Sequence, residues 1–425
     1  MFCTNRKGMH NRKALVYCCS FGWLLTAFGS AFPAIAATPS GTYSNVVMRA
    51  IPTADSSSEE ITLGLNGDLW FGEAVANNIG RLIPSGPIIE YAVPTPGGGP
   101  SGITLGPDGA IWFCEWTGNK IARITTAGVI TEFLIPTANS EPNGITTGPD
   151  GALWFVEEQA SVSQIGRITT SGSFTEYPVP TRNSRPYWIT AGPDGALWFT
   201  EYTVNKIGRI TTSGAITEYP VPTVNPALNW ITAGPDGALW FAENSGNKIG
   251  RITTAGAVTE YPVPTPSGGP LAITTGPDGA LRFTEQYSGK IGRITTSGLI
   301  TEFLAAAGSR PVGMAPGPGH ALWFVLEDSN AIGSAPACAL GLSASFAGTT
   351  LTTDFDLGVA QSGIWSVYAG DTVLLRKEIP AVAPPHQFAV SFGAFPNEAN
   401  VTVTSALSAA GGETLCSEWT TVSLE

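Results

Sequence analysis

Residues 189–223 read ITAGPDGALWFTEYTVNKIGRITTSGAITEYPVPT, and close variants of this phrase recur along most of the 425-residue chain. Within the phrase, four short segments rich in β-branched and aromatic residues are separated by turn sequences, Pro-Asp-Gly or Thr-Thr-Ser-Gly. The turn glycine recurs every 41 to 44 residues, at Gly64, Gly106, Gly148, Gly192, Gly234, Gly276 and Gly317. A repeat of this length, built from strand-like segments, predicts one four-stranded β-propeller blade per unit.

The two ends of the repeat predict how the ring closes. Seven units carry the first three strand segments, but only six carry the fourth, which residues 216–223 exemplify. Residues 45–53, NVVMRAIPT, precede the first unit and have the fourth-strand pattern. Because an unpaired strand edge is unfavourable, we expect this segment to complete the last blade. The sequence therefore predicts an all-β protein with a seven-bladed β-propeller over residues 45–335.

The N-terminus has the pattern of a secretory leader. Four basic residues fall within residues 6–13, an apolar stretch covers residues 14–33, and Ala-Ile-Ala at 34–36 fits a cleavage site. A membrane anchor is the alternative, which a cleavage site directly after the apolar stretch disfavours. We predict a signal peptide over residues 1–36, a secreted or periplasmic protein, and no membrane attachment after cleavage.

The net charge of the chain limits the kinds of partner that it can bind. Residues 1–36 hold four basic and no acidic residues, so the remainder has 17 Lys and Arg against 33 Asp and Glu, a net charge of −16. Such a surface repels nucleic acid. We expect a monomer that binds a small molecule, a glycan or a peptide.

The repeat ends before the C-terminal segment. Residues 338–425 contain alternating apolar and polar stretches, which predict a small all-β, sandwich-like domain. Cys338 and Cys416 lie near its two ends and are candidates for a disulfide in an exported protein. Cys114 falls in a predicted strand, and we interpret it as a small buried hydrophobic residue.

The repeat also indicates which end of the propeller carries a site. The Pro-Asp-Gly and Thr-Thr-x-Gly turns are short, nearly constant, and meet at one end. The loops that enter the first strand and leave the second meet at the other end, and they differ between units. A rigid scaffold with varied loops is a common way to build a binding site. We therefore place the site on this variable face.

A near-ring of carboxylates ends the second strands of the first six units. Its repetition favours a structural role, such as accepting backbone N–H bonds from a loop. The alternative is that some of these side chains bind a hard cation, Mg²⁺ or Ca²⁺, through oxygen. The candidates for that cation site are Glu157, Glu201 and Glu243. The whole near-ring is Glu73, Glu115, Glu157, Glu201, Glu243 and Glu285.

Other residues break the repeat, and several of them are aromatic. Aromatic rings with amide and guanidinium groups suit an apolar or sugar-like ligand that makes a few polar contacts. Packing between blades is the alternative for the two tryptophans among them. The candidate ligand-binding residues are Arg185, Tyr187, Trp188, Tyr202, Asn229, Trp230, Arg282 and Tyr287.

The phrases GPDGALWFTE, NKIGRITT and ITEYPVPT resemble the blades of the virginiamycin B lyase, or streptogramin lyase, family over roughly residues 45–335. The resemblance implies a seven-bladed propeller. It also implies a carbon-oxygen lyase that opens cyclic depsipeptide antibiotics by Mg²⁺-assisted elimination with a histidine base.

The resemblance also fixes which positions should carry that reaction. The two histidine positions of the family hold Leu271 and Val312 here, and an acidic position holds Arg310. The glutamate position of the last blade holds Leu326, with Glu327 one residue later, and a tyrosine position holds Glu59. Leucine and valine cannot abstract a proton or bind a metal. We therefore predict a ligand-binding propeller, with an active Mg²⁺-dependent lyase or a scaffold or adhesion module as the alternatives.

Overall fold

The computed structural model describes residues 41–42, 46–276, 279–306, 308–318 and 321–336, together with the backbone of seven strands between residues 343 and 423. The predicted signal peptide lies outside the described residues, as does the predicted disulfide, since neither Cys338 nor the side chain of Cys416 is described. Within the described residues, no helix has the length and apolar character needed to span a membrane.

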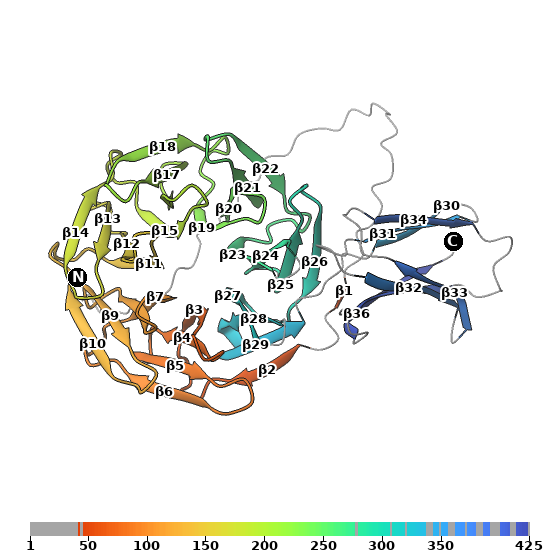
Figure 1. Cartoon of the computed structure of the whole chain (residues 1–425), viewed down its shortest axis with the longest axis horizontal. Coiled ribbons are helices and arrows are strands. Elements are labelled where there is room, and N and C mark those ends of the chain that lie inside the picture. The colour runs from red at the N-terminus through yellow and green to blue at the C-terminus, as the bar shows by residue number, and fades with distance from the viewer. Residues whose placement is uncertain are drawn as a thin grey trace, which may run out of the picture. The chain divides into compact units, whose positions relative to one another are not determined.

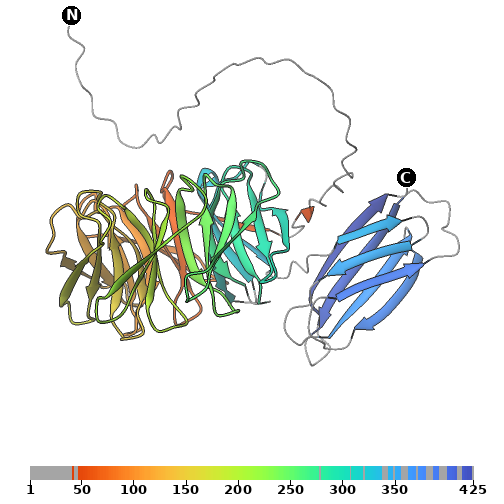
Figure 2. The same ribbon diagram turned by 90° about the horizontal axis from the view of Figure 1, so that it is seen from above.

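Seven antiparallel sheets form a ring, which confirms the predicted seven-bladed β-propeller (Figure 1). Seen edge-on, the blade strands cross the thickness of the ring (Figure 2). The innermost strands are β3 (Ser58–Leu63), β7 (Pro100–Leu105), β11 (Pro142–Thr147), β15 (Pro186–Ala191), β19 (Leu228–Ala233), β23 (Pro270–Thr275) and β27 (Pro311–Gly317). The second strands are β4 (Leu69–Glu73), β8 (Ile111–Glu115), β12 (Leu153–Glu157), β16 (Leu197–Glu201), β20 (Leu239–Glu243), β24 (Leu281–Glu285) and β28 (Ala321–Leu326).

The outer half of each blade follows the same order. The third strands are β5 (Asn78–Leu82), β9 (Lys120–Ile124), β13 (Gln164–Ile168), β17 (Lys206–Ile210), β21 (Lys248–Ile252), β25 (Lys290–Ile294) and β29 (Ala331–Pro336). The fourth strands of blades 1 to 6 are β6 (Ile88–Ala92), β10 (Ile130–Leu134), β14 (Phe174–Pro178), β18 (Ile216–Pro220), β22 (Val258–Pro262) and β26 (Ile300–Leu304).

The N-terminal segment closes the ring, as predicted. Strand β2 (Val47–Ala50) pairs antiparallel with β29 and is the fourth strand of blade 7. The contact continues beyond the strand, because the Ile51 N–H donates to the Asn330 carbonyl at 2.9 Å. Asn330 Nδ2 in turn donates to the carbonyls of Ile51 and Thr53, at 3.2 and 2.9 Å. A two-residue strand, β1 (Gly41–Thr42), also pairs with β26.

Each blade core is built from the side chains that give the repeat its phrase, as blade 4 illustrates. The buried Trp198 donates from Nε1 to Asp194 Oδ1 at 3.0 Å and stacks on Tyr219 with ring centroids 5.5 Å apart. Arg209 lies over the same indole and bonds Asp194 at 2.6 Å. A Cβ at Gly208 would lie 2.0 Å from the Phe199 ring, so only glycine fits there. The same tryptophan contacts recur in blades 2, 3 and 5, and they require one spacing of residues in each of these units.

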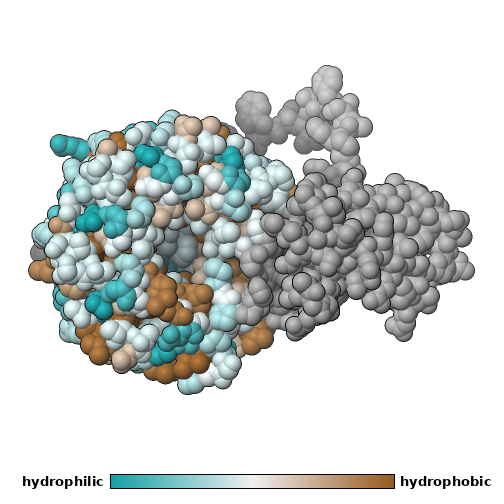
Figure 3. Space-filling model, viewed as in Figure 1, coloured by the Kyte–Doolittle hydropathy of each residue, from teal (hydrophilic) through white to brown (hydrophobic). Residues whose placement is uncertain are grey.

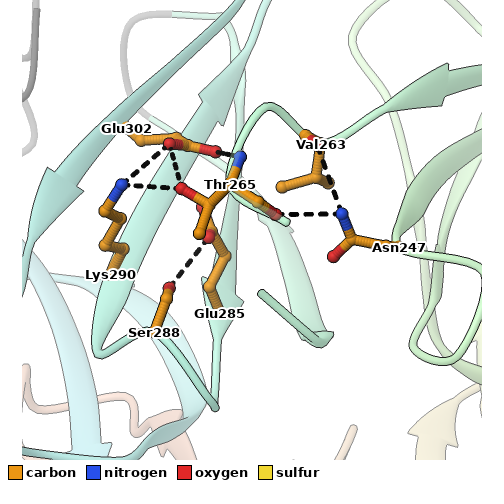
Figure 4. Close-up of polar contacts among 7 residues, drawn as sticks. All are labelled: Asn247, Val263, Thr265, Glu285, Ser288, Lys290 and Glu302. Atoms are coloured by element: carbon orange, nitrogen blue, oxygen red, sulfur yellow. Dashed lines mark hydrogen bonds and ion pairs between the residues drawn. The ribbon is translucent and has the colours of Figure 1, made fainter. Parts of the chain in front are cut away.

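Neighbouring blades are joined by a repeated contact that we call the interblade clasp. Glu260 of blade 5 accepts hydrogen bonds from the N–H and hydroxyl of Thr223, which follows the fourth strand of blade 4. Lys248 completes the clasp with an ion pair to Glu260 at 2.6 Å. Figure 4 shows the same arrangement at Thr265, Glu302 and Lys290. The Thr–Glu contact recurs at six seams: Thr53–Glu90, Thr95–Glu132, Thr137–Glu176, Thr181–Glu218, Thr223–Glu260 and Thr265–Glu302.

The seam between blades 6 and 7 has a different sequence. Met48 stands at the glutamate position and Ala307 at the threonine position. Both partners of the clasp are therefore replaced where the N-terminal strand closes the ring.

The C-terminal segment is also β in its described residues. One sheet contains β30 (Ser343–Ala347), β31 (Thr350–Phe355) and β34 (His386–Ser391). The other contains β33 (Thr372–Ile379), β32 (Ser362–Ala369), β35 (Asn400–Ser408) and β36 (Thr414–Ser423). Two antiparallel sheets match the predicted all-β character, while the predicted domain boundary at residue 338 stays a prediction.

Candidate ligand-binding face

The strand register places the variable loops on one face. The start of each innermost strand pairs with the end of the second strand, as Pro186 does with Glu201. The residue before the first strand and the residues after the second therefore lie together, as the backbone bond from the Tyr202 N–H to the Arg185 carbonyl confirms. The ring surrounds a central hollow, bordered by mostly hydrophilic side chains and by a hydrophobic patch along one side (Figure 3).

The two predicted tryptophans come together at the inner wall of the ring. Trp188 of β15 and Trp230 of β19 stack with ring centroids 3.9 Å apart and an interplanar angle of 11°. Both rings are half-buried. Asn229, by contrast, is buried, and its Nδ2 donates to the Ala227 carbonyl at 3.1 Å. The indole pair therefore joins blades 4 and 5 and keeps part of its surface accessible.

A polar cluster lies beside this pair. The Arg185 guanidinium forms an ion pair with the buried Glu158 and lies 5.6 Å from the centroid of the Tyr202 ring. Tyr202 in turn contacts Tyr187, with centroids 5.6 Å apart. Asn143 Nδ2 donates to the second oxygen of Glu158 at 3.1 Å. Sequence reasoning missed Asn143 and Glu158, although both stand at positions that differ between units.

The backbone conformation at this cluster is a feature of the repeat. Glu141 and Arg185 have φ angles of 52° and 50°, a left-handed conformation that favours glycine. Glycine does occupy the same repeat position in other blades, at Gly99 and Gly269. Ser57 and Ala227 have the same conformation at this position, with φ angles of 52° and 50°, so the conformation belongs to the repeat and does not by itself mark a site.

Two predicted candidates lie apart from the polar cluster and the tryptophans. Arg282 is fully buried in β24, at the position that Trp198 occupies in blade 4, and its cross-strand neighbours are Thr274 and Arg293. It is therefore part of the blade interior and not of the variable face. Tyr287 is on the variable face but belongs to the loop between β24 and β25, where its side chain is exposed.

The near-ring of glutamates is completely buried. No hydrogen bond of standard geometry reaches a carboxyl oxygen of Glu73, Glu115, Glu157, Glu201 or Glu243, although nearby side chains such as Ser140 and Ser184 act to lower the pKa of Glu157 and Glu201. Glu285 accepts a hydrogen bond from the Ser288 hydroxyl at 2.9 Å (Figure 4). Burial, reinforced by the glutamate of the fourth strand, raises the pKa of Glu157, Glu201 and Glu285 to about 8. The same causes raise the pKa of Glu73, Glu115 and Glu243 to about 7.

These carboxyls do not fit a cation. Glu157, Glu201 and Glu243 lie in separate blades, and the described residues contain no group of three or more His, Cys, Asp or Glu that could bind a metal. Hard cations require ionised oxygen ligands that converge on one point. The carboxyls also lack the backbone N–H bonds that we expected from their repetition.

The positions implied by the family resemblance hold apolar or paired side chains. Pro311 pairs with Leu326 as Pro270 pairs with Glu285, so the register leaves Glu327 one residue past the glutamate position. Arg310 binds Glu327 at 2.6 Å. Leu271 and Val312 belong to one apolar cluster, and Glu59 is exposed. These residues therefore do not form a ligand set that fits the Mg²⁺ implied by the family resemblance.

The protein is a seven-bladed β-propeller. One face of the ring carries the nearly constant turns, and the other carries loops whose residues differ between blades. The model of the virginiamycin B lyase family matches residues 37–225 and 159–339, and the chain belongs to this family. No curated protein matches the chain.

Solved structures agree with this assignment. A streptogramin B lyase is 41% identical over 69% of this chain and 99% of its own, with a TM-score of 0.65. Virginiamycin B lyase from Staphylococcus aureus is 42% identical over 68% of this chain and 98% of its own, with a TM-score of 0.65. A catalytically inactive His-to-Ala variant of the latter, solved with quinupristin, gives the same identity, coverage and TM-score.

Proposed function

We propose that this protein is a ligand-binding propeller of the virginiamycin B lyase family that lacks the lyase reaction. The observation that carries the proposal is the apolar pair Leu271 and Val312 at the histidine positions, beside Arg310 neutralised by Glu327. Eliminating a carboxylate from an ester requires a base to remove a proton from the neighbouring carbon. Alkyl side chains supply no such base.

Binding without reaction is consistent with the relatives. The inactive His-to-Ala variant from Staphylococcus aureus was solved with quinupristin, so a histidine can be lost from that protein while ligand still binds. In this chain, the accessible part of the Trp188–Trp230 pair offers apolar surface, and Arg185 with its neighbours offers polar contacts. A small molecule, a peptide or a glycan with an apolar ring face would suit that combination.

The leader pattern and the net charge of −16 support a related proposal about location and partners. The protein would be exported to the periplasm or the medium, would act as a monomer, and would have neither nucleic acid nor membrane as a partner.

A ligand screen tests the binding proposal. Tryptophan fluorescence would be recorded against a panel of cyclic peptides, including quinupristin, and of glycans, and each hit would be titrated by calorimetry. Trp188→Ala and Trp230→Ala are each expected to weaken a hit by about tenfold or more, since stacked aromatic contacts contribute on this scale. Val129→Ala removes an exposed apolar side chain from the constant turn face and should change nothing. If both tryptophan variants bind every hit like the parent, the proposed site is wrong.

A further inference from the structure

A pocket lies on the variable face where blade 6 meets blade 7. It has a volume of about 400 Å³. It is lined by the loop between β24 and β25, residues 286–289, by residues 308–310 before β27, and by Asp328. Arg310 is the single residue that this pocket shares with the replaced lyase positions.

Tyr287 forms a platform at this pocket. A Cβ at Gly269 would lie 2.3 Å from Cδ2 of the Tyr287 ring, so the ring rests on the bare backbone of Gly269. The φ angle of Gly269 is 66°, which also favours glycine at this position. Tyr287 is nevertheless 65% exposed. An aromatic ring that is supported from below and open to solvent above can stack on the apolar face of a ligand.

The polar groups of the pocket are held in place by their neighbours. Arg310 Nη2 donates to Gln286 Oε1 at 3.0 Å, while its Nη1 bonds Glu327 at 2.6 Å. These contacts fix the plane of the guanidinium and neutralise its charge. Ser309 donates its hydroxyl to the Ala306 carbonyl, so its oxygen can only accept a further hydrogen bond.

The net charge of the pocket limits the class of ligand that it can bind. Arg310 is balanced by Glu327, and Asp328 adds one exposed carboxylate, so the pocket has an excess of one negative charge. An anion would be repelled. A neutral ligand that carries both hydrogen-bond donors and acceptors would find partners in the carboxylate, the guanidinium and the serine oxygen.

We propose that this pocket binds a neutral carbohydrate, with a pyranose ring stacked on Tyr287 and its hydroxyls bonded to Asp328 and Arg310. A pyranose combines an apolar C–H face with hydroxyls that both donate and accept. The pocket is separate from the Trp188–Trp230 site, so this proposal goes beyond the proposed function.

Saturation-transfer NMR and calorimetry test it with defined probes. The full-length mature protein would be titrated with methyl β-glucopyranoside, methyl β-galactopyranoside, mannose and N-acetylglucosamine up to about 50 mM, and with choline and phosphate as charged probes. At least one neutral sugar should bind with a dissociation constant in the range of about 1 to 10 mM. Tyr287→Ala should weaken it by about tenfold, and Tyr287→Phe should bind within about twofold of the parent, because the ring is kept.

Two controls separate this site from other causes. Val75→Ala removes an exposed side chain at the same repeat position in blade 1 and should leave the affinity unchanged. Trp188→Ala should also leave it unchanged, so failure here is distinguishable from failure of the proposed function. Failure of all four sugars to bind would overturn the proposal. So would choline or phosphate binding through Tyr287 in their place, or Tyr287→Ala binding a sugar as the parent does.

Discussion

Replacing Ile51 with Asp is expected to lower the unfolding temperature by about 10 °C or more. Ile51 is 4% exposed and packs in the apolar cluster of blades 7 and 1 with Ile61 and Val325. A carboxylate there would be buried without a partner, which costs several kcal/mol. The substitution thus acts on the N-terminal segment that closes the ring.

Val47→Asp is the matched control for this experiment. Val47 lies four residues earlier, in β2, and is 59% exposed. A charge there remains in water, so a shift of about 1 °C is expected. Both variants would be compared by differential scanning fluorimetry at one scan rate, because large proteins often unfold irreversibly. Equal, small shifts would show that the N-terminal segment is not part of the last blade.

Stability should fall as the pH rises from about 5 to 8.5. The pKa of Glu201 is raised to about 8 by burial, from an ordinary value of 4.5. The protonated form is therefore favoured by folding, and its contribution is present below the ordinary pKa and lost as the pH rises through 8. The five other glutamates of the near-ring have raised pKa values, and so has the buried Glu60, all with the same sign. Glutamates of the interblade clasp, such as Glu218, have a lowered pKa. Their contribution to the stability of the protein is lost only at more acidic pH.

Glu201→Gln isolates one member of the near-ring. The amide stays neutral at every pH, so the variant should have a flatter dependence of unfolding temperature on pH and exceed the parent by about 2 to 5 °C at pH 8.5. Asp55→Asn, which removes an exposed carboxyl in the loop before β3, should follow the parent curve. A Glu201→Gln curve parallel to that of the parent across this range would contradict a neutral buried carboxyl.

The fold could be predicted because its determinants lie within one repeat. Trp198, Asp194 and Arg209 contact one another at fixed spacing, so their recurrence implies the same blade each time. The closing strand could also be predicted, since a fourth-strand phrase missing at one end of the chain appears at the other. Each of these inferences needs only local periodicity and the requirement that strand edges be paired.

The site was harder to predict, because a residue that breaks the repeat can lie either in the blade interior or on the variable face. The sequence alone does not distinguish the two. Arg282 and Arg185 both break the pattern, yet Arg282 replaces a core tryptophan and Arg185 stands at the rim. Glu158 was missed because its role depends on Arg185 of the next blade, a contact that depends on how neighbouring sheets are placed. The pocket beside Tyr287 likewise requires the juxtaposition of blades 6 and 7.

Loss of the elimination reaction in this propeller can be measured directly. The purified protein would be incubated with quinupristin and Mg²⁺, and the mixture separated by liquid chromatography with tandem mass spectrometry. Elimination adds no water, so a ring-opened product would have the mass of the substrate and be recognised by its retention time and fragments. We predict that only the cyclic compound is recovered, whatever its affinity. A linear isomer that accumulates with time and is abolished by EDTA would contradict the account.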